Sequence, residues 1–221
     1  MNKLYNFSYK YTSNKLYFYC TLNQFHSKEK PYRVKRITAS NMAKAVRLSK
    51  YKTRIIEHIE QNPSFILPIE RRNEILTRLT SNELEDISIS RTTVKWGIQV
   101  PDSHHTIYVW FDALLNYLCH LDRWPAALQI IGKDIIWFHA VVFSGILFSL
   151  DLPLPTTIFA HGFVVDEFGK KMAKSVGNVV DPITLMDKYG CDAVRYYFAK
   201  AKLGDDFKYS KLGLEKIMTV N

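Results

Sequence analysis

The strongest constraint on the fold is a strand–turn–helix pattern over residues 128–150. A short apolar run, Leu128–Ile131, is followed by a tight-turn sequence, Gly132-Lys133-Asp134, and then by a long, mostly apolar stretch. The run has the length of a buried strand, and the stretch after it has the length of a helix. Strands that alternate with helices are typical of a mostly parallel sheet. The sequence therefore predicts an α/β fold that binds ligands at the carboxyl end of this strand.

Neighbouring segments continue the alternation. Apolar residues recur at helical spacing from Leu48 to Ile59, and a mostly polar helix is expected from Ile69 to Leu79. Strands are expected where apolar residues alternate or cluster, over residues 87–89, 94–100, 106–110 and 158–160. Further helices are expected to start at aspartates that can act as N-caps, namely Asp112, Asp134, Asp181 and Asp192.

The charge of the chain is concentrated at its beginning. The 221 residues carry a net charge of +9, and residues 1–50 contain eleven lysines and arginines but a single acid, Glu29. Such a segment could contact nucleic acid, act as an organellar targeting sequence, or be poorly packed chain. The sequence leaves these three interpretations open.

Cysteine spacing and hydropathy argue against three classes of protein: zinc-binding, disulfide-stabilised and membrane-spanning proteins. Cys20, Cys119 and Cys191 lie far apart and form no Cys-x-x-Cys pair, which argues against a zinc site and a disulfide framework. The same spacing fits a reducing compartment. No apolar run approaches the roughly 18 residues of a membrane span, so we expect no membrane partner.

A lysine-rich loop lies between His161 and Asn178. Lys170, Lys171 and Lys174 fall within five positions of one another, and glycines flank them. Lysine is a compact charge that suits phosphate oxygens, and glycine allows close approach of the backbone to a ligand. Charge runs are more often solvated loops. On charge alone a solvated loop is favoured, and phosphate binding is the alternative.

Several side chains near the predicted sheet have both a structural and a functional interpretation. The residues that share a helix face or end a strand are Trp110, Ala113, Tyr117, Ile135, His139 and Phe143. Aromatic residues at helical spacing usually pack in the core, and so does a lone histidine on an apolar face. Asp134 could cap a helix or hold ribose hydroxyls, and capping is favoured. Arg91, between strands, is expected to pair with a carboxylate or to stay solvated.

The lysine loop and its flanks resemble motifs of one enzyme family. Lys171-Met172-Ala173-Lys174-Ser175 is similar to the Lys-Met-Ser-Lys-Ser loop of class I aminoacyl-tRNA synthetases, with Ala173 in place of the middle serine. Further blocks, in family order over about residues 47–210, are Ser88-Ile89-Ser90-Arg91, Trp96-Gly97-Ile98, residues 108–113, Gly132-Lys133-Asp134-Ile135 with Phe138-His139, His161-Gly162-Phe163 and residues 177–182. Phe138-His139 favours the methionyl-tRNA synthetases over the enzymes for isoleucine, valine and leucine, which usually carry Gly-Trp-Phe there.

The resemblance implies a fold and an activity. The fold would be a partial Rossmann-like nucleotide-binding catalytic domain with a mostly parallel sheet. Residues 1–45 would be an unassigned basic segment, 46–200 the second half of the catalytic domain, and 201–221 the start of a linker toward an anticodon-binding domain. The activity would be that of a methionine–tRNA ligase, whose substrates are methionine, ATP with Mg²⁺, and tRNA(Met).

The resemblance also implies roles for individual residues. The methionine side chain would be bound by Trp110, Ala113, Tyr117, Ile135, His139 and Phe143. ATP would be bound by Asp134, His161, Gly162, Val164, Lys171 and Lys174. Lys171 and Lys174 would stabilise charge as pyrophosphate leaves. Arg91 would pair with an acidic residue that binds the ammonium group of methionine.

One expected element is missing from this sequence. The first half of the family's nucleotide-binding domain carries a His-x-Gly-His element, and no histidine here has those neighbours. We therefore expect the chain alone not to activate methionine, and a non-catalytic remnant or binding module is the alternative. The location could be cytoplasmic or a mitochondrial or other organellar matrix, and the sequence does not indicate the oligomeric state.

Overall fold

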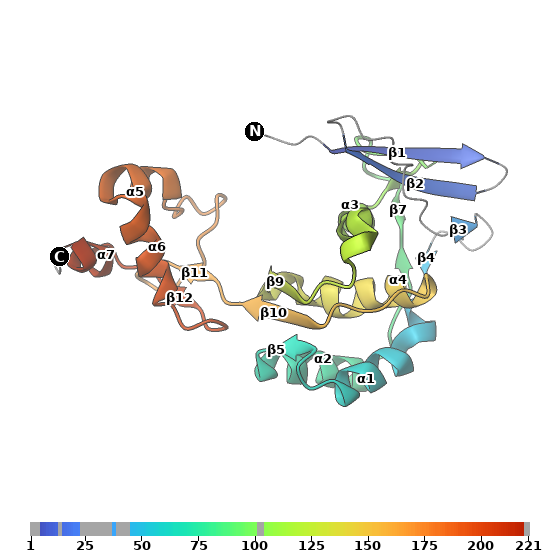
Figure 1. Ribbon diagram of the computed structural model, residues 1–221, viewed down its shortest axis with the longest axis horizontal. Helices are drawn as coiled ribbons and strands as arrows, with labels where there is room; N and C mark the ends of the chain where they lie inside the picture. Colours follow the sequence, from blue (N-terminus) through green and yellow to red (C-terminus); the bar gives the residue numbers. More distant parts are fainter. Residues whose placement is uncertain (1–4, 13–14, 23–36, 39–44, 101–103, 219–221) are drawn as a thin grey trace.

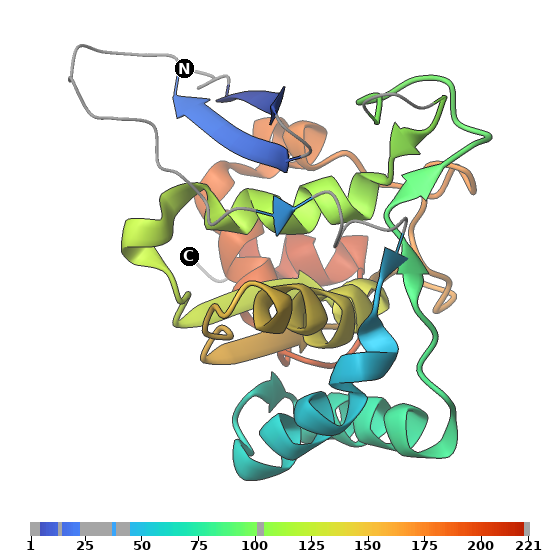
Figure 2. The same cartoon turned by 90° about the vertical axis from the view of Figure 1, so that its right-hand side faces the viewer.

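The structure is a computed structural model that describes residues 5–12, 15–22, 37–38, 45–100 and 104–218 (Figure 1). A small parallel sheet lies near its centre. In Figures 1 and 2, helices α1 (Lys52–Gln61) and α2 (Ile69–Ser81) lie below its strands, and α3 (Val109–Leu115) lies above them. In the part of the chain described, no helix has both the length and the apolar character needed to cross a membrane.

The central sheet contains three parallel strands. Strands β5 (Ile66–Leu67), β10 (Thr157–His161) and β9 (Leu128–Gly132) pair in the order β5-β10-β9. His161 pairs with Gly132 at the carboxyl end, where the loops that follow β9 and β10 therefore start side by side. The predicted strands at 128–131 and 158–160 and the predicted parallel sheet are confirmed.

The two faces of this sheet differ in burial. Ile131, Ile158 and Ala160 point to one face and belong to the main hydrophobic core. On the other face Leu128 and Ile130 are 52% and 67% exposed. Parallel sheets usually have both faces covered, so this face is unusually open in the described part of the chain.

The helix after β9 starts in an irregular way. A single 3-10 turn, η3 (Lys133–Ile135), leads into a π-helical segment, η4 (Phe138–Phe143), and then into α4 (Ser144–Ser149). The predicted N-cap role of Asp134 is wrong, because Gly132 occupies the N-cap position and no side chain caps the turn. Asp134 lies inside the turn, and its carboxylate is therefore available to other partners.

The helices at the start of the described core follow the predicted spacing. A 3-10 turn, η1 (Leu48–Tyr51), leads into α1, which buries Ile55 and Ile59. Helix α2 buries Ile75 and Leu79 in the same way. Both predicted helices are confirmed, since residues three to four apart meet one face of the core.

The predicted strand over residues 94–100 is wrong. Val94 and Trp96 are 47% and 91% exposed, and Ile98 and Val100 are only partly buried, so their alternation does not define a buried face. The short ladders nearby are β7 (Ser90–Arg91) with β8 (Thr106–Ile107) and β4 (Ala45–Val46) with β6 (Ile87–Ser88). Within the described residues, 94–100 contributes an isolated bridge from Gln99 to Thr106.

Two of the predicted helix starts are also displaced. Helix α3 begins at Val109 after Tyr108, so Asp112 lies in its first turn and is not its cap. A 3-10 segment, η2 (Asn116–Arg123), continues it. Helix α6 (Cys191–Ala199) begins after Gly190, whose φ of +82° suits glycine, and Asp192 lies in its first turn.

The C-terminal part of the chain forms a second small core beyond the carboxyl end of β10 (Figure 1). It contains β11 (Val164–Val165) paired with β12 (Phe207–Lys208), and helices α5 (Pro182–Tyr189), α6 and α7 (Lys211–Met218). Asp181 caps α5, and its carboxylate accepts from the N–H groups of Ile183 and Thr184, as predicted. The buried residues of this core are Leu185, Tyr189, Val194, Tyr197, Tyr209 and Leu214.

The basic N-terminal segment contains strands that the sequence analysis did not predict. Strands β1 (Tyr5–Thr12) and β2 (Lys15–Leu22) form an antiparallel hairpin, and β3 (Ile37–Thr38) pairs with β2. Tyrosine and phenylalanine are frequent in the hairpin, and aromatic residues favour strands.

Candidate functional site

Four of the predicted methionine-binding residues form one aromatic cluster. Trp110 comes from α3, Tyr117 from η2, and His139 and Phe143 from η4. The ring of His139 lies 6.2 Å from that of Trp110 and 5.6 Å from that of Tyr117, both edge to face. The ring of Tyr117 lies 5.7 Å from that of Phe143. Residues more than twenty positions apart in sequence therefore meet at one place.

Hydrogen bonds fix the protonation of His139. Its Nδ1 lies 3.0 Å from the carbonyl oxygen of Ile135, and because a carbonyl only accepts, Nδ1 carries the proton. Nε2 then accepts from the hydroxyl of Tyr117 at 3.1 Å. Burial lowers the pKa of His139, and it also raises the pKa of Tyr117. The cluster is therefore uncharged near neutral pH.

The remaining predicted pocket residues are placed differently. Ile135 is half-buried and contributes its carbonyl to His139, whereas Ala113 lies exposed on α3. Phe138 belongs to a motif but has no predicted role, yet its ring stacks on that of Trp110 at 4.2 Å with 9° between the planes. Stacked rings of this kind restrict each other's rotation, so Phe138 fixes one wall of the cluster.

A second group of predicted residues meets at the carboxyl end of β9. The ammonium of Lys171 lies 3.0 Å from Oδ2 of Asp134 and 3.6 Å from the ring centre of Phe163. Both charged side chains are about half exposed, so solvent screens this pair. The contact nevertheless joins the lysine loop to the turn after β9, two segments separated by 37 positions.

A further ion pair beside this contact was not predicted. The ammonium of Lys133 lies 2.6 Å from Oδ1 of Asp206 and 4.6 Å from the ring centre of the same aromatic residue, Phe163. The same carboxylate oxygen accepts from the N–H of Phe163 at 2.8 Å. The hydrogen bond from Lys133, and then that from the Phe163 N–H, lowers the pKa of Asp206. Phe163 and Asp206 thus organise two lysines at this edge.

The other predicted ATP-binding residues lie nearby on β10 and β11. His161 is exposed at the end of β10, and Val164 is 37% exposed on β11. Gly162 has a steric reason to be glycine, because a Cβ there would lie 2.1 Å from the carbonyl oxygen of Asp205. Lys174 is exposed, and no described carboxylate pairs with it.

Arg91 lies apart from both groups. Its guanidinium lies 3.7 Å from the ring centre of Tyr108 and donates to the carbonyl oxygens of Ser88 and Ser90. Among the described residues no carboxylate pairs with it, and no contact links it to His139 or to Lys171. The carbonyl and ring contacts hold the guanidinium in place on the β7 side of the molecule.

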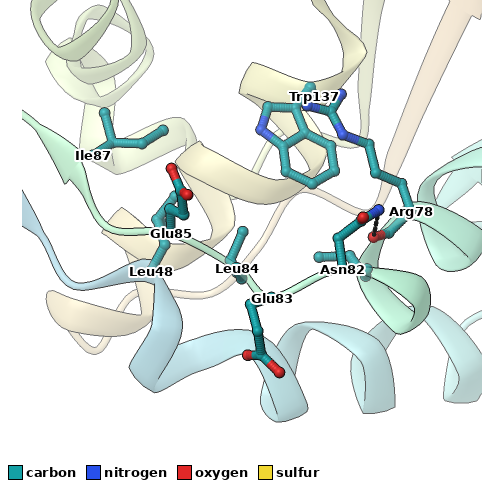
Figure 3. A pocket seen from close by; sticks show the side chains of 9 residues that line it. Leu48, Arg78, Asn82, Glu83, Leu84, Glu85, Ile87 and Trp137 are labelled. Carbon is teal, nitrogen blue, oxygen red and sulfur yellow. Dashed lines mark hydrogen bonds between the residues drawn. The ribbon is translucent and has the colours of Figure 1, made fainter.

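Two cavities lie away from these groups. One, of about 450 Å³, lies between η1, the end of α2 and Trp137, where Arg78 stacks on the Trp137 ring at 3.7 Å (Figure 3). The other, of about 490 Å³, is lined by residues of the lysine loop, among them Asp166, Met172 and Asn178, and by residues of α5 and α7. None of the predicted site residues lines either cavity.

Comparison with known proteins gives a consistent result. The family described as tRNA synthetases class I (M) matches residues 33–220. The methionine–tRNA ligase of Rhizobium meliloti (strain 1021) is 48% identical over 181 residues, and that of Bacillus subtilis (strain 168) is 44% identical over 166 residues. These matches cover 76% and 70% of this chain but 35% and 25% of the relatives, so the chain spans about a third or less of their length.

The structural comparison agrees with the sequence comparison. The crystal structure of Mycobacterium tuberculosis methionyl-tRNA synthetase bound by methionyl-adenylate matches 86% of this chain and 38% of its own chain, with a TM-score of 0.72 and 40% identity. The apo form of the same enzyme matches with a TM-score of 0.65. This chain belongs to the class I tRNA synthetase family, in its methionyl branch.

Proposed function

We propose that this chain supplies the second half of the catalytic domain of a methionine–tRNA ligase. The observation that carries the proposal is the contact of Lys171 with Asp134, in a chain of the methionyl family. It joins the ammonium of a flexible lysine side chain to the carboxyl end of a parallel strand, where α/β folds bind nucleotides. Relatives with this fold are methionine–tRNA ligases, and one neighbour carries methionyl-adenylate.

The first step would be the activation of methionine. A carboxylate oxygen of methionine attacks the α-phosphorus of ATP, the bond from that phosphorus to pyrophosphate breaks, and pyrophosphate leaves with the electron pair. Lys171 and Lys174 would stabilise the developing charge, and no covalent protein nucleophile is needed. The adenylate would then transfer its methionyl group to tRNA(Met), releasing AMP.

ATP binding would replace the ion pair between Lys171 and Asp134 with contacts from each residue to the nucleotide. The Asp134 carboxylate would hold the ribose hydroxyls, so Lys171 would leave it and move to the phosphates. His161, Gly162 and Val164 would border the nucleotide. Mg²⁺ would enter on the phosphates of ATP, because it keeps several of its waters and is bound largely through substrate phosphates.

The aromatic cluster would bind the methionine side chain. Trp110, Tyr117 and Phe143 offer flat apolar surfaces, which suit a polarizable thioether. The neutral His139 adds a polar group without a charge. Ala113 and Ile135 would complete the wall, and Arg91 would act through a carboxylate supplied by the other half of the domain.

Two further parts of the proposal concern the whole protein. The division into residues 1–45, 46–200 and 201–221 stays a prediction. Charging of tRNA takes place wherever translation occurs, so a cytoplasmic location and an organellar matrix both fit the function. The alternative is a non-catalytic remnant or binding module that keeps this segment of the fold.

One experiment with two arms tests the proposal. Residues 47–218 replace the aligned segment of the Rhizobium meliloti ligase, and methionine-dependent ATP–pyrophosphate exchange is measured for this chimera and for the isolated 221-residue chain. We expect exchange by the chimera, a loss of about 10²–10³-fold in Lys171→Ala and Lys174→Ala, and no useful rate for the isolated chain.

Lys170→Ala is the matched control, because Lys170 lies in the same loop and has no proposed role. It should leave exchange by the chimera unchanged. A folded but inactive chimera would favour the non-catalytic alternative. Exchange by the isolated chain at a rate near that of intact enzymes would refute the expectation that it needs the missing half.

A further inference from the structure

Asn178 lies at the end of the lysine loop, and both the oxygen and the nitrogen of its side-chain amide are hydrogen-bonded within the loop. Its amide oxygen accepts from the N–H of Ala173 at 3.0 Å. Its amide nitrogen donates to Oδ2 of Asp166 at 2.8 Å and to the carbonyl oxygen of Lys171 at 3.3 Å. An asparagine amide offers two donor hydrogens and an acceptor oxygen, and here every one of these groups has a partner in the loop.

These bonds join two separate halves of the loop. The first half is a hairpin, in which the N–H of Met172 donates to the Val164 carbonyl at 3.1 Å and Lys171 stands next to that bond. The second half is a tight turn, in which the N–H of Gly177 donates to the carbonyls of Ala173 and Lys174 at 3.2 Å. Lys171 and Lys174 therefore lie in different halves of the loop, and Asn178 joins these halves through the carbonyl of Lys171 and the N–H of Ala173.

Asp166 holds the tip of the hairpin and receives Asn178 on its other side. Its Oδ1 accepts from the N–H groups of Phe168 at 3.0 Å and Lys170 at 2.9 Å, while Oδ2 accepts from Asn178. The hydrogen bond from Asn178, and then that from the Lys170 N–H, lowers the pKa of Asp166. One carboxylate oxygen of Asp166 therefore holds the tip of the hairpin, and the other binds Asn178.

We propose that Asn178 is a positioning residue that sets the spacing of Lys171 and Lys174, with Asp166 as its partner. It acts through the carbonyl of Lys171 and through the N–H of Ala173, the residue before Lys174. The inference rests on the proposed function for the identity of the anion that the two lysines meet, the phosphates of ATP. The spacing of the lysines themselves is a property of the loop and is tested without catalysis.

Cleavage by trypsin measures how often the lysine loop opens in the intact 221-residue chain. Trypsin can cleave after Lys170, Lys171 and Lys174 only once the loop has opened locally. In Asn178→Ala we expect cleavage at these positions to be about tenfold faster, the scale of one or two lost hydrogen bonds. Cleavage after Lys200 and Lys202, and the midpoint of thermal unfolding, should not change. Asn62→Ala is the matched control, since Asn62 bonds to His58 at the end of α1.

Exchanging the two residues separates positioning from simple loss of a side chain. Asn178→Asp alone places two carboxylates against each other and should also speed cleavage. Asp166→Asn combined with Asn178→Asp restores a donor opposite a carboxylate, and the amide oxygen introduced at position 166 can still accept from the N–H groups of Phe168 and Lys170. This double variant still cannot donate to the Lys171 carbonyl, so it should be cleaved more slowly than Asn178→Asp alone but not as slowly as the parent.

The outcomes are distinct. Unchanged cleavage in Asn178→Ala, or a double variant that is cleaved as fast as Asn178→Asp alone, overturns the proposal. Faster loop cleavage with rescue by the exchange supports it. The proposed function fails separately, through an inactive chimera, whatever the cleavage pattern of the loop.

Discussion

At the scale of single residues, His139 is a buried histidine with both ring nitrogens bonded. Nδ1 donates to the Ile135 carbonyl and Nε2 accepts from Tyr117. Protonation of Nε2 would place a hydrogen against the hydroxyl hydrogen of Tyr117 and would bury a charge among aromatic rings. Burial therefore keeps the pKa of His139 below its ordinary value of 6.5.

This shift predicts a dependence of stability on pH. As the pH falls below 6.5, the unfolded chain binds a proton at this site before the folded chain does. The stabilising contribution is thus complete above pH 6.5 and is lost as the pH falls through the lower, folded pKa. Urea unfolding at about pH 7.5, 6.5 and 5.5 measures it as a fall in the free energy of unfolding.

His139→Gln should flatten this slope, whatever its effect on stability at neutral pH. His58 is the comparison, because burial and then the charge of Arg54 lower its pKa as well. His58→Gln should remove a separate part of the slope. An unchanged slope in His139→Gln would show that the histidine does not titrate as argued.

Only part of the residue-level site could be predicted from the sequence. The residues of the aromatic cluster could be identified because Trp110 and His139 belong to the motifs, and Tyr117 and Phe143 follow them at helical spacing. Lys133 and Asp206 are 73 positions apart and meet through the packing of the C-terminal core, which no local pattern reveals. Asn178 is visible as part of Gly177-Asn178, but its partner Asp166 depends on the hairpin of the loop.

At the scale of elements, the aspartates show when a helix start can be predicted. Asp181 is followed by Pro182, whose fixed φ and missing N–H suit the first helical position, and it does cap α5. Asp112, Asp134 and Asp192 lack this proline, and each lies inside a turn. A carboxylate near a helix start is favourable in either position, so the aspartate alone does not fix the boundary.

The two aspartates of the C-terminal helices can be compared directly. Asp181→Ala removes acceptors for two backbone N–H groups and for the Thr184 hydroxyl at 2.9 Å, and we expect Tm to fall by about 2–4 °C. Asp192→Ala removes a first-turn carboxylate that caps nothing and should lower Tm by less than about 1 °C. Thermal unfolding followed by circular dichroism measures both. Equal shifts would contradict the assignment of the cap.

Strand prediction succeeded in the parallel core sheet and failed where alternation lay on the surface. Residues 128–131 and 158–160 each place side chains such as Ile131, Ile158 and Ala160 in the core, although Leu128 and Ile130 are exposed on the other face. Residues 94–100 alternate equally well, but Trp96 is 91% exposed and no described sheet face receives it. Periodicity reports a difference between two faces and does not show whether either of them is covered.

At the scale of the whole molecule, Gly162 is the point where two segments cross. The backbone of Asp205 and Asp206 passes so close that a Cβ on residue 162 would overlap three backbone atoms. Backbone cannot rotate away as a side chain can, so we expect Gly162→Ala to lower the free energy of unfolding by about 3 kcal/mol. Urea unfolding measures this change.

Gly213→Ala is the control for this substitution. The nearest atom to its added Cβ is on the ring of Tyr197 at 3.3 Å, and alanine favours the helix more than glycine does. Its effect should be smaller than about 1 kcal/mol. A similar loss in both variants would mean that the crossing at Gly162 is not a specific constraint.

The position of Asp206 near the C-terminal end of the chain determines where the protein can be truncated without loss of its ion pair with Lys133. A stop codon after residue 200 removes Asp206 together with Tyr209 and Leu214, which are buried in the second core. Lys133 and Lys171 would then face the Phe163 ring without the carboxylate of Asp206. A fragment that keeps the Lys133–Asp206 pair and the second core therefore extends through α7, and cloning boundaries are best set beyond Met218.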